Sequence, residues 1–390
     1  MELSALCIFL YIMATLIELM DLNELGQCSK DCTRQSKWKP TTQRYLSNLL
    51  PNLVELQDEI LEHHYEVKQT NDFYLNERGH IRKIEAPAVR DRVIQKTITK
   101  NVLTPAIVPY LIYDNYASLK LRGTHFGRRR LEMLLHKYIR KNGINGYVLL
   151  IDIRKYFENI DHGVLKQLVA PKVSDQPIEV VELINYIIDH SSHTAKGLNL
   201  GSEAPQILAV YYLNSIDHYV KVVRGIKYYG RYMDDIFIIG KSKDDLKQLL
   251  TEIEAKLSEV LLEVNKKKTQ IVNLRHGFTW LQTKYNILPG GRIIKRLTRG
   301  KIARERRRLK AFRKMLDEGR MTEIEIQNAY RSWRGSVVRE YNSCCKSLQR
   351  MDSLYKQLFP FEIEYTRRGR TELLKEAFKE AQKEDINCLI

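Results

Sequence analysis

Two adjacent carboxylates, Asp234 and Asp235, lie between two short apolar runs, and this arrangement constrains the fold more than any other feature of the chain. The runs Tyr228–Tyr232 and Ile236–Gly240 contain the aromatic and β-branched residues that favour strands. We therefore predict a tight hairpin with both acids at its turn. An isolated Asp pair is better explained as a pair of turn residues, so the interpretation depends on what accompanies it.

A third carboxylate, Asp152, directly follows the run Tyr147–Ile151, which has the pattern of a buried strand. A core strand has no reason to carry an acid at its end unless that acid has a function. Three carboxylates on neighbouring strands can hold two divalent cations, and ligands of this kind select Mg²⁺. Two such ions about 3.5–4 Å apart suit in-line nucleotidyl transfer. Together the three acids favour a metal site over turn capping.

The charge balance predicts a polyanionic partner. The 390 residues include 64 Lys and Arg against 47 Asp and Glu, a formal charge of +17. The segment 295–314 alone has eleven basic residues and one acid, Glu305, and is predicted to be a basic helix. A block of one sign repels itself unless it is neutralised, which phosphates do. The 22 tyrosines add rings that stack on bases or pack at the edge of a core.

The cysteines and the N-terminus carry less information. The six cysteines have no zinc spacing, so we expect reduced thiols in a cytoplasmic protein and no structural metal. The apolar stretch from Leu3 to Ile17 is too short to span a membrane and lacks the basic start of a secretory signal. A buried helix and a start codon upstream of the true one, with Met13 or Met20 as alternatives, both remain open.

The pattern along the chain predicts alternating helices and hairpins. Asp161 is expected to cap a helix and to have no catalytic role. The other expected elements are a hairpin turning at 76–79, a helix from Val89 toward Leu103 that Pro105 and Pro109 interrupt, a cationic loop over 120–130, a helix over 244–262, a strand over 270–272, and a strand pair over 278–288 that turns at 289–291.

The order of these motifs resembles a known family. Along the chain follow Asp152 at a strand end, a glycine-rich segment reaching Gln206, Tyr232-Met233-Asp234-Asp235, Lys268-Thr269, and the hairpin Phe278–Tyr285. From about Arg82 to Lys314 the chain resembles a prokaryotic reverse transcriptase, closest to the stand-alone bacterial enzymes of anti-phage defence and of diversity-generating retroelements. One departure is Asn199, where many relatives have proline.

The resemblance implies an α+β fold: a right-hand polymerase with an antiparallel palm sheet, helical fingers and a basic helical thumb. The implied domains are an apolar or linker segment at 1–36, fingers at 37–146, a palm with interleaved finger helices and a primer-grip hairpin at 147–290, and a helical thumb with a C-terminal tail at 291–390.

The resemblance also assigns residues to roles. Catalysis would rest on Asp152, Asp234, Asp235 and Lys268, with the lysine protonating the leaving pyrophosphate, and metal contacts on Asp152, Ile153, Asp234 and Asp235. Phe157 would block a ribose 2′-hydroxyl, for which size alone is enough. The remaining nucleotide contacts would be Arg82, Lys83, Arg92, Arg122, Gln206, Tyr232 and Met233. Primer and template contacts would be Trp280, Leu281, Arg304, Arg307 and Arg308.

The implied activity is RNA-directed DNA synthesis with two Mg²⁺ ions, or Mn²⁺ as a substitute, from dNTPs on an RNA template, with DNA as product. We expect a dedicated non-coding RNA partner, a role in anti-phage defence and no membrane association. A protein partner or a homo-oligomer stays open. The alternatives are a diversity-generating retroelement enzyme, an RNA-directed RNA polymerase, and a catalytically silent RNA-binding protein.

Overall fold

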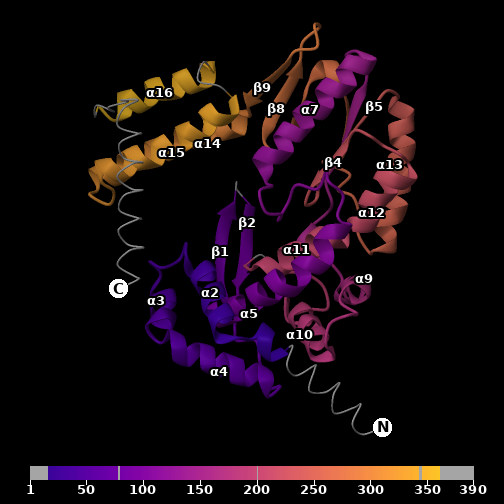
Figure 1. The fold of residues 1–390 in the computed structure, drawn as a ribbon. Coiled ribbons are helices and arrows are strands. Elements are labelled where there is room, and N and C mark those ends of the chain that lie inside the picture. The colour runs from indigo at the N-terminus through magenta and orange to yellow at the C-terminus, as the bar shows by residue number, and fades with distance from the viewer. Residues whose placement is uncertain (1–15, 78–79, 200, 342–344, 361–390) are drawn as a thin grey trace, which may run out of the picture. The chain divides into compact units, whose positions relative to one another are not determined.

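The chain divides into two compact units in a computed structural model (Figure 1). The larger comprises Met1–Leu281 with Tyr285–Ile294, and the smaller comprises Gln282–Lys284 with Lys295–Ile390. The residues that the structure describes are 16–77, 80–199, 201–341 and 345–360. Most of the N-terminal apolar stretch, residues 3–15, therefore lies outside them. Within those ranges, no helix combines the length and apolar character needed to cross a bilayer.

The centre of the larger unit is a four-stranded antiparallel sheet with the strand order β4-β5-β3-β6. The predicted hairpin around the paired acids is confirmed as β4 and β5, and the predicted strands before Asp152 and after Lys268 are confirmed as β3 and β6. The bounds are β3 Tyr147–Ile151, β4 Tyr229–Tyr232, β5 Asp235–Gly240 and β6 Gln270–Asn273. These local runs form strands because they are rich in β-branched and aromatic residues.

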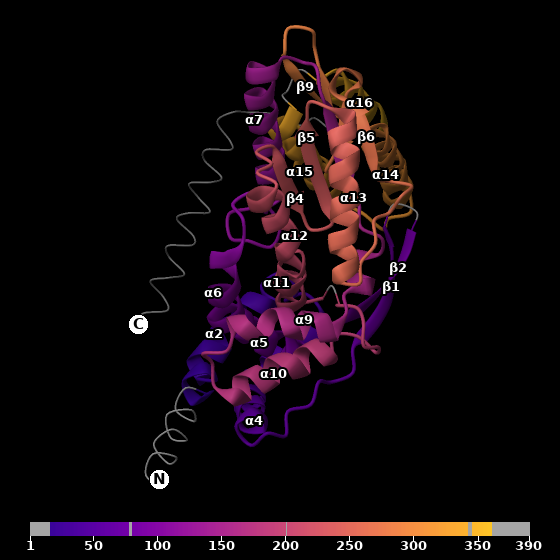
Figure 2. The same ribbon diagram turned by 90° about the vertical axis from the view of Figure 1, so that its right-hand side faces the viewer.

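Both faces of this sheet are covered, so its central strands are apolar on both sides. Leu149 and Ile238 point into a core shared with the amphipathic helix α13 (Lys243–Glu259). Their neighbours along the strands point into a second core shared with α7 (Thr124–Asn142). Figure 2 shows α13 along one side of the sheet. Fully burying such a side chain stabilises the fold by about 1.5–3 kcal/mol, so the sheet is a rigid platform.

The larger unit also contains helices and a separate two-stranded hairpin. The predicted hairpin at 76–79 is confirmed as β1 (Asn71–Glu77) paired with β2 (His80–Ala86), while residues 78–79 of its turn lie outside the described ranges. Further α-helices of this unit are α2 Leu22–Thr33, α3 Pro40–Ser47, α4 Leu49–Leu61, α5 Val89–Ile98, α6 Thr104–Ile107, α8 Tyr156–Asn159, α9 His162–Val169, α10 Ile178–Asp189, α11 Glu203–Tyr212 and α12 Asn214–His218.

Two expectations about helix limits in this unit are wrong. The helical path from Val89 does not stop at Pro105: α5 continues through a π-helical turn, Thr99–Leu103, into α6. Pro105 is tolerated because it lies in the first turn of α6, where an N–H is not needed. The cationic loop is also shorter than expected, since α7 already begins at Thr124. The predicted N-cap is confirmed: Asp161 accepts a bond of 3.1 Å from the Val164 amide.

The smaller unit is a helical module on its own core. It holds α14 Arg299–Asp317, α15 Glu323–Tyr341 and α16 Lys346–Leu358. The rings of Tyr330 and Tyr355 stack with centroids 4.1 Å apart in its centre. The boundary between the units runs through a three-stranded sheet of β7 Phe278–Trp280, β8 Thr283–Ile287 and β9 Ile293–Leu297. The basic helix was expected from residue 295, but Lys295 and Arg296 lie in β9 and Thr298 caps the helix.

Candidate active site

The sheet register brings the three predicted acids to one end of the palm sheet. Ile151, the last residue of β3, pairs with Ile236 of β5. In an antiparallel pair, the residue after Ile151 lies opposite the residue before Ile236. Asp152 therefore lies opposite Asp235, the first residue of β5. Asp234 precedes it in the turn that closes β4 onto β5. One main-chain arrangement therefore delivers all three acids.

The loop after α13 holds the carboxylate of Asp152. Asn265 donates to its Oδ1 from Nδ2 at 2.9 Å, and Lys268 donates to its Oδ2 from Nζ at 3.0 Å. The backbone is fixed as well: the amide of Asn265 donates to the Asp152 carbonyl at 2.7 Å, and the Asp152 amide donates to Thr269 Oγ1 at 3.4 Å. The Asp152 side chain is 16% exposed, so it is ordered yet accessible. Neither Asn265 nor Thr269 was predicted as a site residue.

The turn that carries Asp234 has a left-handed residue. Met233 has φ +52°, a conformation that costs a non-glycine residue energy and marks functional turns. Its neighbour Tyr232 is half-buried, and this burial raises the pKa of the Tyr232 phenol. The negative charge of Asp235 also raises this pKa, whereas the positive charge of Arg128 lowers it. The side chains of this turn therefore lie in a strongly charged surrounding.

Phe157 lies on the short helix α8, five residues after Asp152 in the sequence. It is half-buried and packs edge-to-face on Tyr156, with ring centroids 5.5 Å apart. Burial raises the pKa of the Tyr156 phenol. The positive charge of Arg231 lowers this pKa, and the negative charge of Asp234 raises it. The steric role predicted for Phe157 stays a prediction.

Gln206 and Arg122 line one cavity. Gln206 was expected in the glycine-rich segment, but it lies inside α11, where its Oε1 accepts from Ser118 Oγ at 3.2 Å. Arg122 donates from Nη1 to the carbonyls of Tyr113 and Asn115 at 2.9 and 2.8 Å. The cavity has a volume of about 570 Å³, and its other charged residues are Lys96, Lys100, Lys120 and Glu203. These two predicted nucleotide contacts therefore share a basic pocket.

The predicted triphosphate contacts on the hairpin of β1 and β2 and on α5 are differently placed. Lys83 donates to Asp72 at 2.7 Å and to Glu85 at 2.9 Å, and these bonds raise the pKa of the Lys83 ammonium. The side chain of Arg82 lies outside the described residues. Arg92 is half-buried on α5. The structure thus does not bring Lys83 and Arg92 together with the pocket of Arg122.

Within the described ranges, one group of metal-ligand types converges between the hairpin of β1 and β2 and the segment after α10. Single ligand atoms of Asp72, Glu85 and His193 lie within 4.8 Å of one another, while the trio of Asp152, Asp234 and Asp235 is not such a group there. The ammonium of Lys83 already supplies positive charge between the two hairpin carboxylates. We therefore interpret the hairpin group as an ion-pair cluster.

The predicted primer and template contacts differ in exposure. Trp280 is buried and packs edge-to-face on Phe237 at 4.8 Å, so it supports its hairpin from within. Leu281 is half-exposed at the hairpin turn, where its carbonyl accepts from Arg128 Nη2 at 2.7 Å.

The three predicted arginines of α14 in the smaller unit also differ. Arg304 and Arg307 are exposed, and Arg307 lines a basic surface hollow on this helix. Arg308 instead donates to the buried Glu305 at 2.7 Å. Burial raises the pKa of the Glu305 carboxyl, and the charge of Arg308 opposes this shift. Arg308 therefore has a structural partner inside its own unit, which its two neighbours on the exposed face do not share.

The family is decided by a sequence comparison. The model of the family "Reverse transcriptase (RNA-dependent DNA polymerase)" matches residues 68–287, more than half of the chain. The chain belongs to the reverse transcriptase family. This reverse transcriptase is 23% identical over 278 residues to Protein YkfC of Escherichia coli (strain K12), an alignment that covers 60% of this chain and 71% of that protein.

Solved structures similar to this reverse transcriptase include two telomerases. Apo telomerase from Candida tropicalis matches with a TM-score of 0.46 and 13% sequence identity, and the match covers 76% of this chain. Telomerase from Candida albicans, solved with a fragment of telomeric RNA, matches with a TM-score of 0.46 and 11% identity, also over 76% of this chain. The chain spans 60% and 61% of the length of these two telomerase chains.

The family match confirms three expectations. This reverse transcriptase is an RNA-directed DNA polymerase, a nucleotidyltransferase whose partner is an RNA template. Its fold is the expected mixture of helices and antiparallel sheets. Members of the family use divalent metal ions.

Proposed function

We propose that the enzyme synthesises complementary DNA at a two-metal centre held by Asp152, Asp234 and Asp235. The observation that supports this most is the register of Ile151 with Ile236, which sets the chain after β3 beside the turn between β4 and β5. The proposed domains are fingers at 37–146, palm at 147–290, and thumb with tail at 291–390. In this proposal the palm sheet supplies the chemistry and the other domains hold the nucleic acid.

The donor set fits hard divalent cations. Three carboxylates supply oxygen atoms only, which suits Mg²⁺ and also Mn²⁺. Asp152 and Asp234 would be the main ligands that hold the ions, with Asp235 in support and a main-chain contact from Ile153, which is buried and bridged to Val264. When bound, the pair of ions activates the attacking hydroxyl and stabilises charge on the leaving pyrophosphate.

The protein groups around the acids orient the reactants. Lys268 lies 3.0 Å from Asp152 and would protonate the pyrophosphate as it leaves, a role that requires its ammonium to turn away from the carboxylate. Phe157 would exclude a ribose 2′-hydroxyl by its size. Tyr232, Met233 and Gln206 would contact the nucleotide from two sides, with Gln206 also lining the basic cavity.

Basic residues would hold the polyanions. Arg122 offers a rigid guanidinium in the cavity near Gln206, and Arg82, Lys83 and Arg92 would grip the triphosphate. In the smaller unit, Arg304 and Arg307 on the exposed face of α14 would contact the duplex backbone. Leu281, on the turn supported by Trp280, would contact the primer end. Such contacts read backbone shape more than sequence.

Specificity would therefore come from a dedicated non-coding RNA, and we propose a cytoplasmic role in anti-phage defence. A diversity-generating retroelement is the second candidate, because the resemblance covers both groups. The genes beside this one separate the two: a template repeat paired with a variable repeat favours diversification, whereas a co-encoded structured RNA without such repeats favours defence.

The test of the chemistry is primer extension with dNTPs or NTPs on an RNA template. We expect DNA synthesis with dNTPs by the unmodified protein, and its loss in Asp234→Ala. The matched control is Asp244→Ala, which removes an exposed acid of α13 that pairs with Lys247. Extension that survives Asp234→Ala would overturn the site, and preference for NTPs would favour an RNA-directed RNA polymerase.

A further inference from the structure

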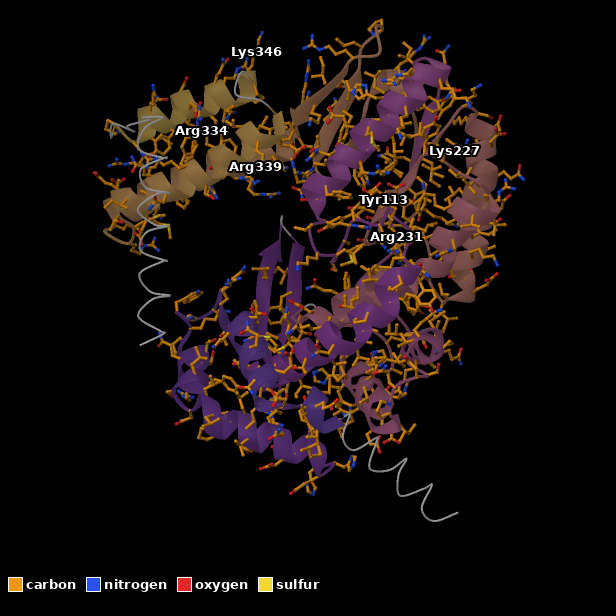
Figure 3. The ribbon with its side chains drawn as sticks, viewed as in Figure 1. Tyr113, Lys227, Arg231, Arg334, Arg339 and Lys346 are labelled. Carbon is orange, nitrogen blue, oxygen red and sulfur yellow. The ribbon has the colours of Figure 1, made fainter. Side chains whose placement is uncertain are left out.

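A buried charge cluster lies directly behind the acid-bearing turn. Arg231 stands three residues before Asp234 in β4 and is the largest fully buried side chain of the described residues (labelled in Figure 3). Its partner Asp217, on the short helix α12, is equally buried, with 0% exposure of both side chains. Neither residue was predicted to belong to the site. Burying two charges is costly unless each is paired and hydrogen-bonded, so this cluster needs a reason.

Hydrogen bonds donated by the Arg231 guanidinium hold the cluster together. Nε of Arg231 donates to Asp217 Oδ1 at 2.8 Å, and Nη2 donates to Asp217 Oδ2 and to the Val210 carbonyl, the latter at 2.8 Å. Tyr229 lies on the same face of β4 and donates its hydroxyl to Asp217. Burial and the charge of Asp217 raise the pKa of the Tyr229 phenol, which keeps it protonated as a donor. Strand β4 and helices α11 and α12 are thereby joined at one point.

One remaining bond reaches the turn itself. Nη1 of Arg231 donates to the Met233 carbonyl at 3.2 Å. This carbonyl belongs to the peptide between Met233 and Asp234, and Met233 is the residue with φ +52°. A strained backbone conformation persists only when its surroundings determine it, and the planar fork of an arginine does so with fixed geometry. The peptide that precedes Asp234 is therefore held by a bond that begins in the buried cluster.

We propose that Arg231 and Asp217 are positioning residues that set the direction of the Asp234 carboxylate. The proposal rests on the proposed metal centre. Asp217 fixes the guanidinium, and the guanidinium fixes the peptide before Asp234. A lysine at position 231 keeps the charge and pairs with Asp217, but its single ammonium cannot bridge Asp217, the Val210 carbonyl and the Met233 carbonyl at once.

The test compares Arg231→Lys with Arg130→Lys. Arg130 forms a similar pair with the nearly buried Asp114, at 2.7 Å, in the same unit. We measure kcat and KM for dTTP on poly(rA)/oligo(dT), Mn²⁺ affinity by electron paramagnetic resonance, and the melting temperature. In Arg231→Lys we expect kcat to fall about 10²-fold, the loss typical of a displaced catalytic group. We expect KM to change by about twofold at most, because the loss arises in the transition state.

Mn²⁺ affinity should fall in Arg231→Lys and not in Arg130→Lys. A second variant guards against misfolding: the triple substitution Arg231→Met, Asp217→Leu and Tyr229→Phe removes the whole cluster, and apolar replacement of a buried pair is often tolerated. The melting temperature of this triple variant should be close to that of Arg130→Lys. Its kcat and its Mn²⁺ affinity should still be lower than those of the unmodified protein. Values equal to those of Arg130→Lys in both variants would overturn the proposal. Asp234→Asn separates the two failures, because full activity in that variant would instead overturn the metal centre.

Discussion

The four-stranded palm sheet and the hairpin of β1 and β2 in the larger unit both carry charged side chains, but they hold them in different ways. Two cores enclose the sheet, and the side chain of Asp152 is bonded to two residues of a neighbouring loop. The hairpin has only two strands, with Phe73 and Tyr74 exposed by 46% and 74%. Isolated hairpins are marginally stable, whereas buried sheets are rigid. The difference suggests that chemistry is built on the sheet and adaptable contacts on the hairpin.

The largest expected effect tests the palm side of this comparison. Asp152→Asn keeps the shape of the side chain but removes the charge that would hold the ions. We expect kcat to fall about 10³-fold, equivalent to several kcal/mol of lost electrostatic stabilisation. The assay is single-nucleotide incorporation, with Asp244→Asn on α13 as the matched control. If both variants incorporate nucleotides at the same rate, Asp152 has no role in the chemistry.

A stability measurement compares the two regions directly. Leu149 is fully buried in the sheet, and Leu149→Ala should lower the free energy of unfolding by about 2–5 kcal/mol. Phe73 is exposed on the hairpin, and Phe73→Ala should change it by about 0.5 kcal/mol or less. Urea denaturation at equilibrium measures both. Equal losses would mean that the hairpin is as firmly packed as the sheet, which would remove the physical basis of the comparison.

The same contrast explains what the sequence could predict. The strands and the acids at their ends follow from local runs such as Tyr147–Ile151, because burial on both faces demands apolar residues. The partners of those acids come from distant segments: Asn265 is 113 residues from Asp152, and no local pattern signals their contact. Arg231 and Asp217 were missed for another reason: a charged residue in a strand usually indicates an exposed face.

The hairpin contacts were harder still to predict. The charge of Lys83 made it a natural phosphate ligand, but its pairing with Asp72 depends on cross-strand geometry that the sequence does not reveal. Pro105 shows a similar limit: a proline inside a helical pattern normally ends the helix, and only the π-helical turn before it allows the path to continue.

Lys268 tests whether the loop after α13 does more than hold Asp152. Lys268→Met should lower kcat about 10²-fold, the usual contribution of a general acid. The loss should shrink when the β,γ-bridging oxygen of the dNTP is replaced by a difluoromethylene group, because a more acidic leaving group needs less protonation. Lys267→Met is the control from the same loop. A loss that is equal for both leaving groups would assign Lys268 to positioning Asp152 through their 3.0 Å contact.

Phe157 tests selectivity at the sugar, where a smaller effect is expected. Phe157→Ala removes the ring that we propose excludes the 2′-hydroxyl, and we expect the preference for dNTPs over NTPs to fall about tenfold or more, since a steric contact is worth about 1–3 kcal/mol. The ratio of kcat/KM for dTTP and UTP measures this. Tyr156→Phe, which alters the neighbouring ring without changing its size, is the control. An unchanged ratio in Phe157→Ala would mean that another group excludes the 2′-hydroxyl.

The smallest expected effect is a change in the KM for dTTP on substitution of hairpin residues. Whether KM rises or falls depends on competition between the triphosphate and the hairpin carboxylates for Lys83. Lys83 is bonded to Asp72 and Glu85, so a triphosphate would have to compete with these carboxylates for the ammonium. Lys83→Met should raise KM for dTTP about threefold, in keeping with a weak, solvent-screened contact, and leave kcat unchanged. Asp72→Asn should act in the opposite direction and lower KM, because it releases Lys83. Lys247→Met, which breaks a surface pair on α13, controls for loss of charge. If Asp72→Asn raises KM instead, the carboxylate holds Lys83 in its working position, and the hairpin is as preorganised as the palm.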